Sequence, residues 1–114
     1  MKKFIKIMKA LSDPNRVKMM KMIQSRPFCV CEIKTALNIA QSTASKHLKI
    51  LEEAELVQSF KDGLWVNYTL ADGKDSPYSA NMIANLQHWL EDETEIKALN
   101  QILPGINRED IVGK

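Results

Sequence analysis

The segment VCEIKTALNIAQSTASKHLKILEEAEL, residues 30–56, decides how this chain folds. Apolar residues recur at i, i+3 and i+7 in its first part and at i, i+4 and i+7 in its second part; they are Val30, Ile33, Leu37, Ala44, Leu48 and Leu51. Each spacing predicts a helix with one apolar face. Residues 38–42 separate the two helices, and Gln41 or Ser42 is expected to cap the second. This pattern is typical of a helix-turn-helix.

The opposite face of the second helix is short, polar and basic. At about 100° per residue it gathers Ser42, Ser45, Lys46 and Lys49, with Gln41 at its start and Thr43 and His47 on its flanks. A helix that enters the major groove needs small hydroxyl side chains to approach base edges and lysines to meet phosphates. The face therefore favours DNA binding, and a merely solvated helix surface is the alternative interpretation.

Charge is distributed unevenly along the chain. Residues 1–26 contain eight Lys or Arg and a single acid, Asp13, whereas residues 72–114 contain four Lys or Arg and eight Asp or Glu. A basic side that faces a polyanion would explain this asymmetry, and so would a basic solvated helix. The formal net charge of +2 does not discriminate between them.

The length and composition of the chain predict one small domain. The 114 residues are 45% hydrophobic and 26% charged, which is ordinary for a soluble globular protein with a single core. No apolar run approaches the roughly 18 residues of a membrane span, and the lysine-rich start lacks a signal-peptide core, so we expect a cytoplasmic protein. Cys29 and Cys31 are too close in sequence for a disulfide between them to join distant parts of the fold. In a reducing compartment they are free thiols or ligands.

Two further helices are expected before the central pair. The first covers residues 3–12, and Asp13-Pro14 predicts the N-cap and first position of a second helix that ends near Ser25. The apolar positions expected in the core are Phe4, Ile7, Met8, Leu11, Val17, Met20 and Ile23, with Met19 and Met22 widening the second face.

A hairpin is expected after the central pair, because strand-like residues 56–61 and 64–70 surround Asp62-Gly63. In the second run Leu64, Val66, Tyr68 and Leu70 alternate with polar or aromatic neighbours, so one face can pack inward. A helix-turn-helix followed by such a hairpin is a winged-helix arrangement. Lys61, beside the hairpin tip, is expected near the DNA backbone, where it contributes affinity more than sequence choice.

One long helix is predicted over residues 78–103, after a polar linker. Its apolar stripe is Met82, Leu86, Trp89, Ile96, Leu99 and Leu103, more than so small a domain readily buries against itself. We therefore expect a mainly α fold of about five helices and a two-stranded wing, dimeric through its first and last helices. Residues 1–103 form the domain, and residues 104–114 are a polar tail of low expected order.

Four segments stand in one order along the chain: ALSDPNRVKMMKMI, FCVCEIKTAL, STASKHLKILEEAELV and KDGLWVNYTL. Together they resemble the ArsR/SmtB family of metal-sensing bacterial repressors over about residues 4–92, and the Cys-Val-Cys segment is similar to that of its arsenic-responsive branch. The resemblance implies a homodimer that binds DNA without inducer and is released when a metal or metalloid binds. A two-fold dimer also suits DNA physically, since it reads half-sites roughly 34 Å apart.

Cys29 and Cys31 are candidate ligands, because thiolates suit arsenic, antimony, copper(I), cadmium and zinc. Both lie at or just before a helix N-terminus, where the dipole is expected to lower the thiol pKa. Residues i and i+2 point the same way in an extended segment but diverge by roughly 200° on a helix. Ligation should therefore distort the first turn and reposition residues 42–49. Two small buried hydrophobes are the alternative interpretation.

The sequence does not identify a third ligand to join Cys29 and Cys31. In the arsenic-sensing members that this segment resembles, a third cysteine follows three residues after the second, and here that position is Lys34. A non-thiol ligand, an external thiol or a monosubstituted arsenical could complete the site, or the site is degenerate. The expected inducer is arsenite, antimonite or another soft metal(loid), and no cofactor is expected for folding.

A second sensing site is implied by the resemblance, on the last helix. Asp75, His88 and Glu91 match its spacing for zinc-like ions, although Pro77 replaces one histidine. A His and a Glu on an acidic helix surface are more often simply solvated. His47 is interpreted as a helix-flank residue that touches phosphate.

Two other functions are open, and a third is not expected. The same fold could respond to thiol oxidation, or the winged helix could bind proteins instead of DNA. An enzyme is not expected, because Cys-x-Cys lacks the redox spacing, the sequence contains no Gly-rich phosphate loop, and neither histidine is placed by sequence as a base for the thiols.

Overall fold

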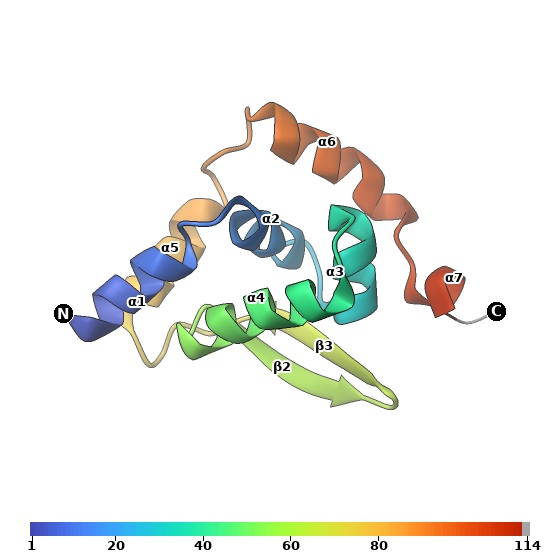
Figure 1. The fold of residues 1–114 in the computed structure, drawn as a ribbon. Coiled ribbons are helices and arrows are strands. Elements are labelled where there is room, and N and C mark those ends of the chain that lie inside the picture. Colours follow the sequence, from blue (N-terminus) through green and yellow to red (C-terminus); the bar gives the residue numbers. More distant parts are fainter. Residues whose placement is uncertain (113–114) are drawn as a thin grey trace.

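A computed structural model describes residues 1–112, which form seven α-helices, one 3₁₀ turn and a three-stranded antiparallel sheet (Figure 1). In chain order the elements are α1 (Lys2–Ala10), α2 (Pro14–Ile23), β1 (Phe28–Cys29), α3 (Val30–Leu37), α4 (Gln41–Glu53), β2 (Val57–Asp62), β3 (Trp65–Leu70), α5 (Pro77–Leu86), α6 (Thr94–Ile102), η1 (Leu103–Gly105) and α7 (Arg108–Val112). The mainly α winged helix-turn-helix predicted from sequence is confirmed, with more helices than expected. Within the described part of the chain, no helix is long and apolar enough to cross a membrane.

The helix-turn-helix consists of α3 and α4, whose apolar faces meet in the core. Ile33, Ala44, Leu48 and Leu51 are all fully buried, as the spacing predicted. The expected cap is wrong, because α4 begins one residue earlier than predicted. Its N-cap is Ala40, and no side chain caps it.

The start of α2 agrees with the sequence prediction. Asp13 is the N-cap, and its Oδ1 accepts hydrogen bonds from the backbone N–H groups of Asn15 (2.8 Å) and Arg16 (3.2 Å). Four of the apolar residues of α2 are buried, namely Met19, Met20, Met22 and Ile23. On α1 the prediction holds for Ile7 and is wrong for Phe4, which stays 42% exposed.

The sheet contains one strand that sequence did not predict. The strand order is β1–β3–β2, because Phe28 pairs with Tyr68 and Cys29 pairs with Asn67. The wing, residues 57–70, is the β2–β3 hairpin. Its two-residue loop is Gly63-Leu64, one position later than expected, and the +63° φ of the glycine supplies the left-handed conformation that this turn needs.

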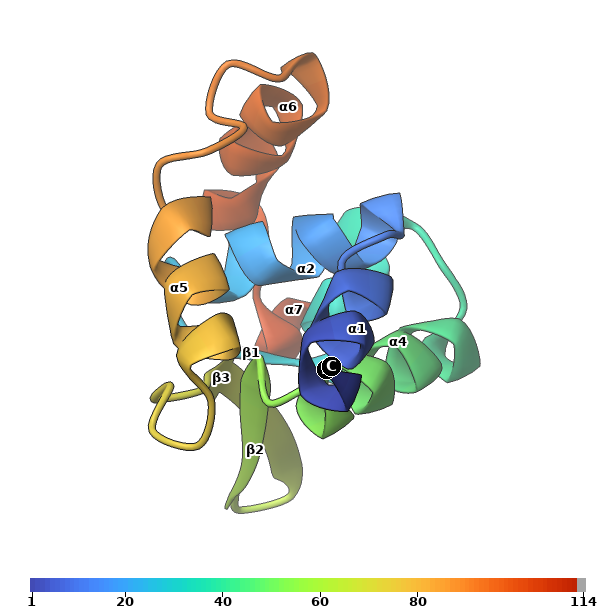
Figure 2. The same cartoon turned by 90° about the vertical axis from the view of Figure 1, so that its left-hand side faces the viewer.

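The predicted inward face of the second wing strand is wrong in its outer half. Leu64 and Val66 are exposed, whereas Asn67 is buried. Figure 2 shows the reason: the hairpin projects away from the helices, so its tip has no core to pack on. Only the base of the wing contributes to the core, through Tyr68 and Leu70.

The single long helix predicted over residues 78–103 is wrong. It is divided into α5 and α6 by residues 87–93, where Leu90 adopts a left-handed φ of +68°. The apolar stripe is then largely satisfied within one chain, since Leu86, Ile96, Leu99 and Leu103 are buried, Met82 is half-buried and only Trp89 is exposed. The stripe alone therefore no longer argues for a partner chain.

A buried lysine from α2 holds the break in place. Lys21 is 1% exposed, and its Nζ donates to the carbonyl oxygens of Leu86 (2.6 Å) and Trp89 (2.9 Å) and to Oε1 of Glu91 (2.6 Å). The cation thus satisfies carbonyls that the end of α5 leaves free. The hydrogen bond from Lys21 also lowers the pKa of the Glu91 carboxyl below its ordinary value.

Residues 104–112 are more ordered than expected. They form the end of η1 and the helix α7, which packs on α3, so the predicted low order of the tail is wrong for these residues. α1 lies beside α5 at one end of the described part of the chain, and α7 lies at the other end (Figure 1). The division into residues 1–103 and 104–114 stays a prediction.

Lys21→Met should lower the free energy of unfolding by about 1–3 kcal/mol, because it leaves backbone carbonyls at the end of α5 without a donor. Chemical denaturation followed by circular dichroism measures this. Lys97→Met, an exposed change on α6, is the control and should stay within about 0.5 kcal/mol of the parent. Equal stability of the two variants would contradict the role given to Lys21.

Candidate functional site

The polar face of α4 is open to solvent. The exposed residues are Gln41, Ser42, Thr43, Ser45, Lys46 and Lys49, and His47 is half-buried on the flank. The buried side of the same helix packs on the core, so the exposed side is held in a fixed orientation. All the hydroxyl groups expected at base edges lie within the first turns of the helix.

Arg16 fixes one edge of this face. Its Nη1 lies 2.9 Å from Nδ1 of His47, and its Nε donates to the carbonyl of Ala10 at the end of α1 (2.7 Å). Because a guanidinium has no acceptor, His47 Nδ1 must accept, and the ring proton is then on Nε2. The arginine therefore links α1, α2 and α4 and leaves the Nε2–H of His47 as the group that can donate outward.

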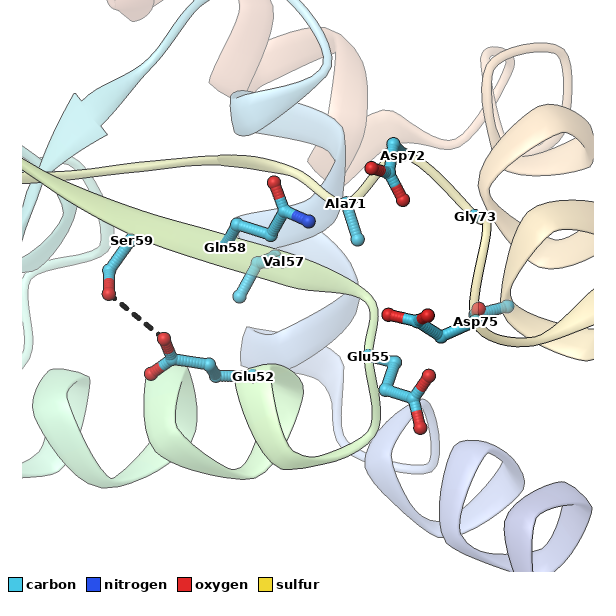
Figure 3. Close-up of a pocket in the computed structure, with 10 residues that line it drawn as sticks. Glu52, Glu55, Val57, Gln58, Ser59, Ala71, Asp72, Gly73 and Asp75 are labelled. Atoms are coloured by element: carbon cyan, nitrogen blue, oxygen red, sulfur yellow. Dashed lines mark hydrogen bonds between the residues drawn. The ribbon is translucent and has the colours of Figure 1, made fainter.

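The wing lies beside α4, and Lys61 near its tip is exposed. At the base of the wing, a pocket is lined by the carboxylates of Glu52, Glu55, Asp72 and Asp75 (Figure 3). Glu52 accepts a hydrogen bond from Ser59 Oγ (2.9 Å), which joins α4 to β2. The molecule thus presents basic side chains at the wing tip and on α4, and acidic ones at the wing base.

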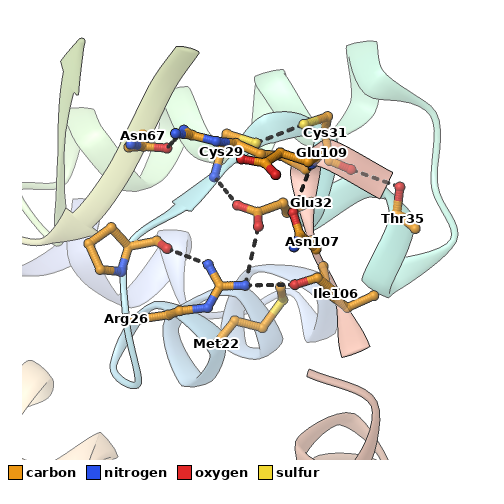
Figure 4. Close-up of polar contacts among 12 residues, drawn as sticks. Met22, Arg26, Cys29, Cys31, Glu32, Thr35, Asn67, Ile106, Asn107 and Glu109 are labelled. Atoms are coloured by element: carbon orange, nitrogen blue, oxygen red, sulfur yellow. Dashed lines mark hydrogen bonds and ion pairs between the residues drawn. The ribbon is translucent and has the colours of Figure 1, made fainter. Parts of the chain in front are cut away.

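The two cysteines lie at the start of the helix-turn-helix. Cys29 is the N-cap of α3 with extended backbone (φ −87°, ψ 166°), and Cys31 lies in the first turn. Their sulfurs are 2.7 Å apart and both thiols are free (Figure 4). The prediction that the two side chains diverge by roughly 200° is therefore wrong, because only Cys31 has helical geometry. The two thiols face one point before any ligand binds.

The expected drop in the pKa of both thiols is wrong for Cys29. Its side chain is buried, and this desolvation, with the hydrogen bond to Cys31 and the charge of Glu32, raises the pKa of Cys29 to about 12. Burial outweighs the favourable dipole of a helix only two turns long. Cys29 is thus a neutral thiol near pH 7.

Glu32 organises the backbone around the thiols. It is 5% exposed; its Oε1 accepts from the N–H of Cys29 (3.0 Å), and its Oε2 accepts from Nη2 of Arg26 (3.2 Å). The spacing is that of a capping box, in which the third helical residue bonds back to the N-cap. The guanidinium of Arg26 also lies 3.7 Å from the centroid of the Phe28 ring.

The other proposed ligands are not brought together within one chain. Among residues 1–112, no group of three or more His, Cys, Asp or Glu side chains is placed to hold a metal ion. Asp75 precedes α5 and His88 follows it, so about 15 Å of helix separates them. Glu91 is engaged by Lys21.

Comparison with known proteins adds to this geometry. Residues 13–59 match the family model described as "Bacterial regulatory protein, arsR family". The chain is 30% identical over 98 residues to the arsenical resistance operon repressor of Escherichia coli, which covers 83% of this chain and 80% of that protein. The chain belongs to the ArsR family.

Two further proteins are similar to this chain over much of its length. An uncharacterized HTH-type transcriptional regulator of Methanocaldococcus jannaschii is 37% identical over 73 residues, covering 63% of this chain and 82% of that protein. The homodimeric winged helix-turn-helix DNA-binding domain of a possible ArsR-family regulator from Mycobacterium bovis superposes with a TM-score of 0.65 at 27% identity, covering 75% and 76% of the two chains. The names of these relatives describe transcriptional regulators.

The roles of several residues in this ArsR-family site were not predicted from the sequence. The Cys-x-x-Glu spacing from Cys29 to Glu32 was a readable signal, because it matches the capping box that starts with Ser or Thr. Arg16 and Arg26 gave no local signal, since their partners lie on other elements.

His47 should exist as the Nε2–H tautomer in this ArsR-family chain, because Arg16 occupies Nδ1. Long-range ¹H–¹⁵N NMR of the imidazole measures the tautomer directly. In Arg16→Met both tautomers should be populated, whereas Lys18→Met, on the same helix, should leave the ring unchanged. A protonated Nδ1 in the parent would contradict the assignment.

Proposed function

We propose that this chain is a DNA-binding transcriptional repressor that leaves its operator when trivalent arsenic binds Cys29 and Cys31. The observation that carries the proposal is the pair of free sulfurs, 2.7 Å apart, at the first turn of the helix-turn-helix. The name of the similar Escherichia coli protein, an arsenical resistance operon repressor, supports the class of inducer.

The exposed face of α4 supports DNA as the partner. Hydroxyl groups at its start can approach base edges, and Lys46 and Lys49 can reach phosphates. Lys61 at the wing adds a phosphate contact beside the half-site, and Nε2–H of His47 can donate to another. Gln41, Ser42, Thr43 and Ser45 are the proposed base-reading residues.

A homodimer is proposed because one such helix reads only a few base pairs. The Mycobacterium bovis neighbour is homodimeric. On this chain, the rings of Phe4 on α1 and Tyr78 on α5 meet edge-on, 5.6 Å between centroids, and both stay more than 40% exposed. An uncovered apolar patch of this kind suits a second copy, so α1 and α5 form the proposed interface.

Proton balance favours arsenite over a divalent cation at this site. Arsenite is a neutral hydroxide, and As(OH)₃ + 2 RSH gives (RS)₂As–OH + 2 H₂O, so no net proton is released and no element changes oxidation state. A divalent metal instead needs thiolates and must displace the thiol protons. The high pKa of Cys29 therefore penalises cadmium or zinc more than arsenic or antimony.

Two sulfurs satisfy two of the three bonds of trivalent arsenic. Within the described residues no third side chain joins the pair, and Lys34 is at the position of the family's third cysteine. The third bond is then kept by hydroxide, by an external thiol or by the organic group of a monosubstituted arsenical. The last of these fits a two-thiol site without any further ligand.

Ligation should change the first turn of α3. With metal–sulfur bonds of about 2.3 Å and angles of about 90–110°, two bound sulfurs lie roughly 3.3–3.8 Å apart. The two sulfurs already converge on one point, so ligation would fix their separation and restrain the first turn of α3. Because α3 packs directly on α4, a shift at its start can reorient the DNA face and lower affinity, which is how a ligand biases two states.

Arsenite should release the parent protein from DNA but not Cys29→Ser/Cys31→Ser. Fluorescence anisotropy on DNA from upstream of its own gene, under reducing conditions, measures release, and sedimentation of the complex should give two chains per operator. If DNA binds but arsenite and phenylarsine oxide do nothing, the inducer is wrong, and thiol oxidation or zinc at Asp75, His88 and Glu91 takes its place. A chain that binds no DNA contradicts the proposal altogether.

Arsenite affinity should change less than about threefold between pH 6 and 8, whereas cadmium affinity should rise at least tenfold per pH unit, since Cys29 alone must lose one proton to it. Competition titration against a fluorescent dithiol reagent measures both. The Cys29→Ser/Cys31→Ser protein is the blank. A cadmium affinity that rises less than tenfold per pH unit, together with an arsenite affinity that falls as the pH rises, would show that Cys29 is ionised in the free protein.

A further inference from the structure

The C-terminal segment, residues 103–112, reaches both the thiol site and the wing. It comprises η1 and α7, and α7 packs on α3. Ile106 and Asn107 line one pocket with Glu32, and Figure 4 shows Arg26 joined to both Glu32 and Ile106. We call this segment the strap.

Arg108 joins the strap to both strands of the wing. Its Nη2 donates to Oδ2 of Asp62 (3.1 Å) and its Nη1 to Oδ1 of Asn67 (3.5 Å). The guanidinium carbon lies 4.8 Å from the centroid of the Trp65 ring. Asp62 and Trp65 flank the two-residue loop at the wing tip, so this one side chain holds the part of the wing that lies beyond the core.

The other end of the strap is tied to the thiol site. Nη2 of Arg26 donates to the carbonyl of Ile106 (3.0 Å) and to Glu32 (3.2 Å), and Glu32 bonds the N–H of Cys29. Hydrogen bonds therefore lead from the backbone N–H of Cys29 through Glu32 and Arg26 to Ile106, and the backbone of the strap continues to Arg108, which contacts the wing. A shift of the first turn of α3 moves Glu32 and loosens the hold on Ile106.

We propose that the strap holds the wing in its DNA-binding orientation and releases it when the Cys29–Cys31 pair is ligated, with Arg108 as the positioning residue. The ligand half of this inference rests on the proposed function. The hold of Arg108 on the wing does not, because it follows from contacts in the free protein. The planar guanidinium bridges two acceptors while stacking on Trp65, which a lysine cannot reproduce.

The test uses Trp65 as a reporter, in a Trp89→Phe background that leaves it the single tryptophan of the chain. Without ligand, Arg108→Ala and Arg108→Lys should both change the Trp65 emission and weaken DNA binding about three- to tenfold. Lys97→Ala removes the same charge from an exposed position on α6 and should leave the emission unchanged. Parent-like emission in both Arg108 variants would overturn the role of the strap.

Phenylarsine oxide, a two-thiol reagent, then tests the coupling. When intact mass shows it bound, the Trp65 emission of the parent should move toward that of Arg108→Ala, and Arg108→Ala itself should not change further. A bound parent whose Trp65 does not respond overturns the coupling. Absence of a bound adduct overturns the proposed thiol site instead, while the ligand-free comparison still decides whether Arg108 positions the wing.

Discussion

The buried carboxylate of Glu32 is the contact on which the rest of the site depends. It bonds the N–H of Cys29 and the guanidinium of Arg26, and it lies where β1 ends, α3 begins and the C-terminal segment crosses. Without it, the N-cap of α3 would lose its partner and the two sulfurs would lose their common orientation. A buried charge with hydrogen bonds at both oxygens has one stable geometry, so it defines the starting position of the helix-turn-helix.

The free energy needed to change DNA affinity is similar to that of one hydrogen bond to a charged group, so a small change at Glu32 can act as a switch. A hundredfold change in DNA affinity corresponds to about 2.7 kcal/mol, and one hydrogen bond to a charged group contributes about 1.5–3 kcal/mol. Disturbing a single contact of Glu32 is therefore enough in principle to change occupancy of an operator. The core beneath α3 and α4 need not rearrange, which agrees with the complete burial of Ile33, Leu48 and Leu51.

Sequence predicted what is local and periodic, and missed what depends on distant partners. The Asp13 cap, the two helices of the central motif and the hairpin follow from spacing and turn chemistry within a few residues. The break between α5 and α6 depends on Lys21, 65 residues from Leu86, and the wing contact of Arg108 spans 46 residues to Asp62. Neither leaves a periodic signal. The Cys29 pKa was missed for a related reason, because the dipole is visible in sequence and burial is not.

The same arrangement gives a physical reason for selectivity at the proposed thiol site. Burial and the hydrogen bond to Cys31 raise the pKa of Cys29 and keep its thiol protonated, so the free protein buries no thiolate beside the Glu32 carboxylate. A cation must displace that proton and so works against the high pKa of the thiol. A neutral hydroxide that exchanges water for sulfur avoids this cost, because the thiol proton departs with the hydroxide. The burial that keeps Cys29 protonated would then also select the ligand by its charge.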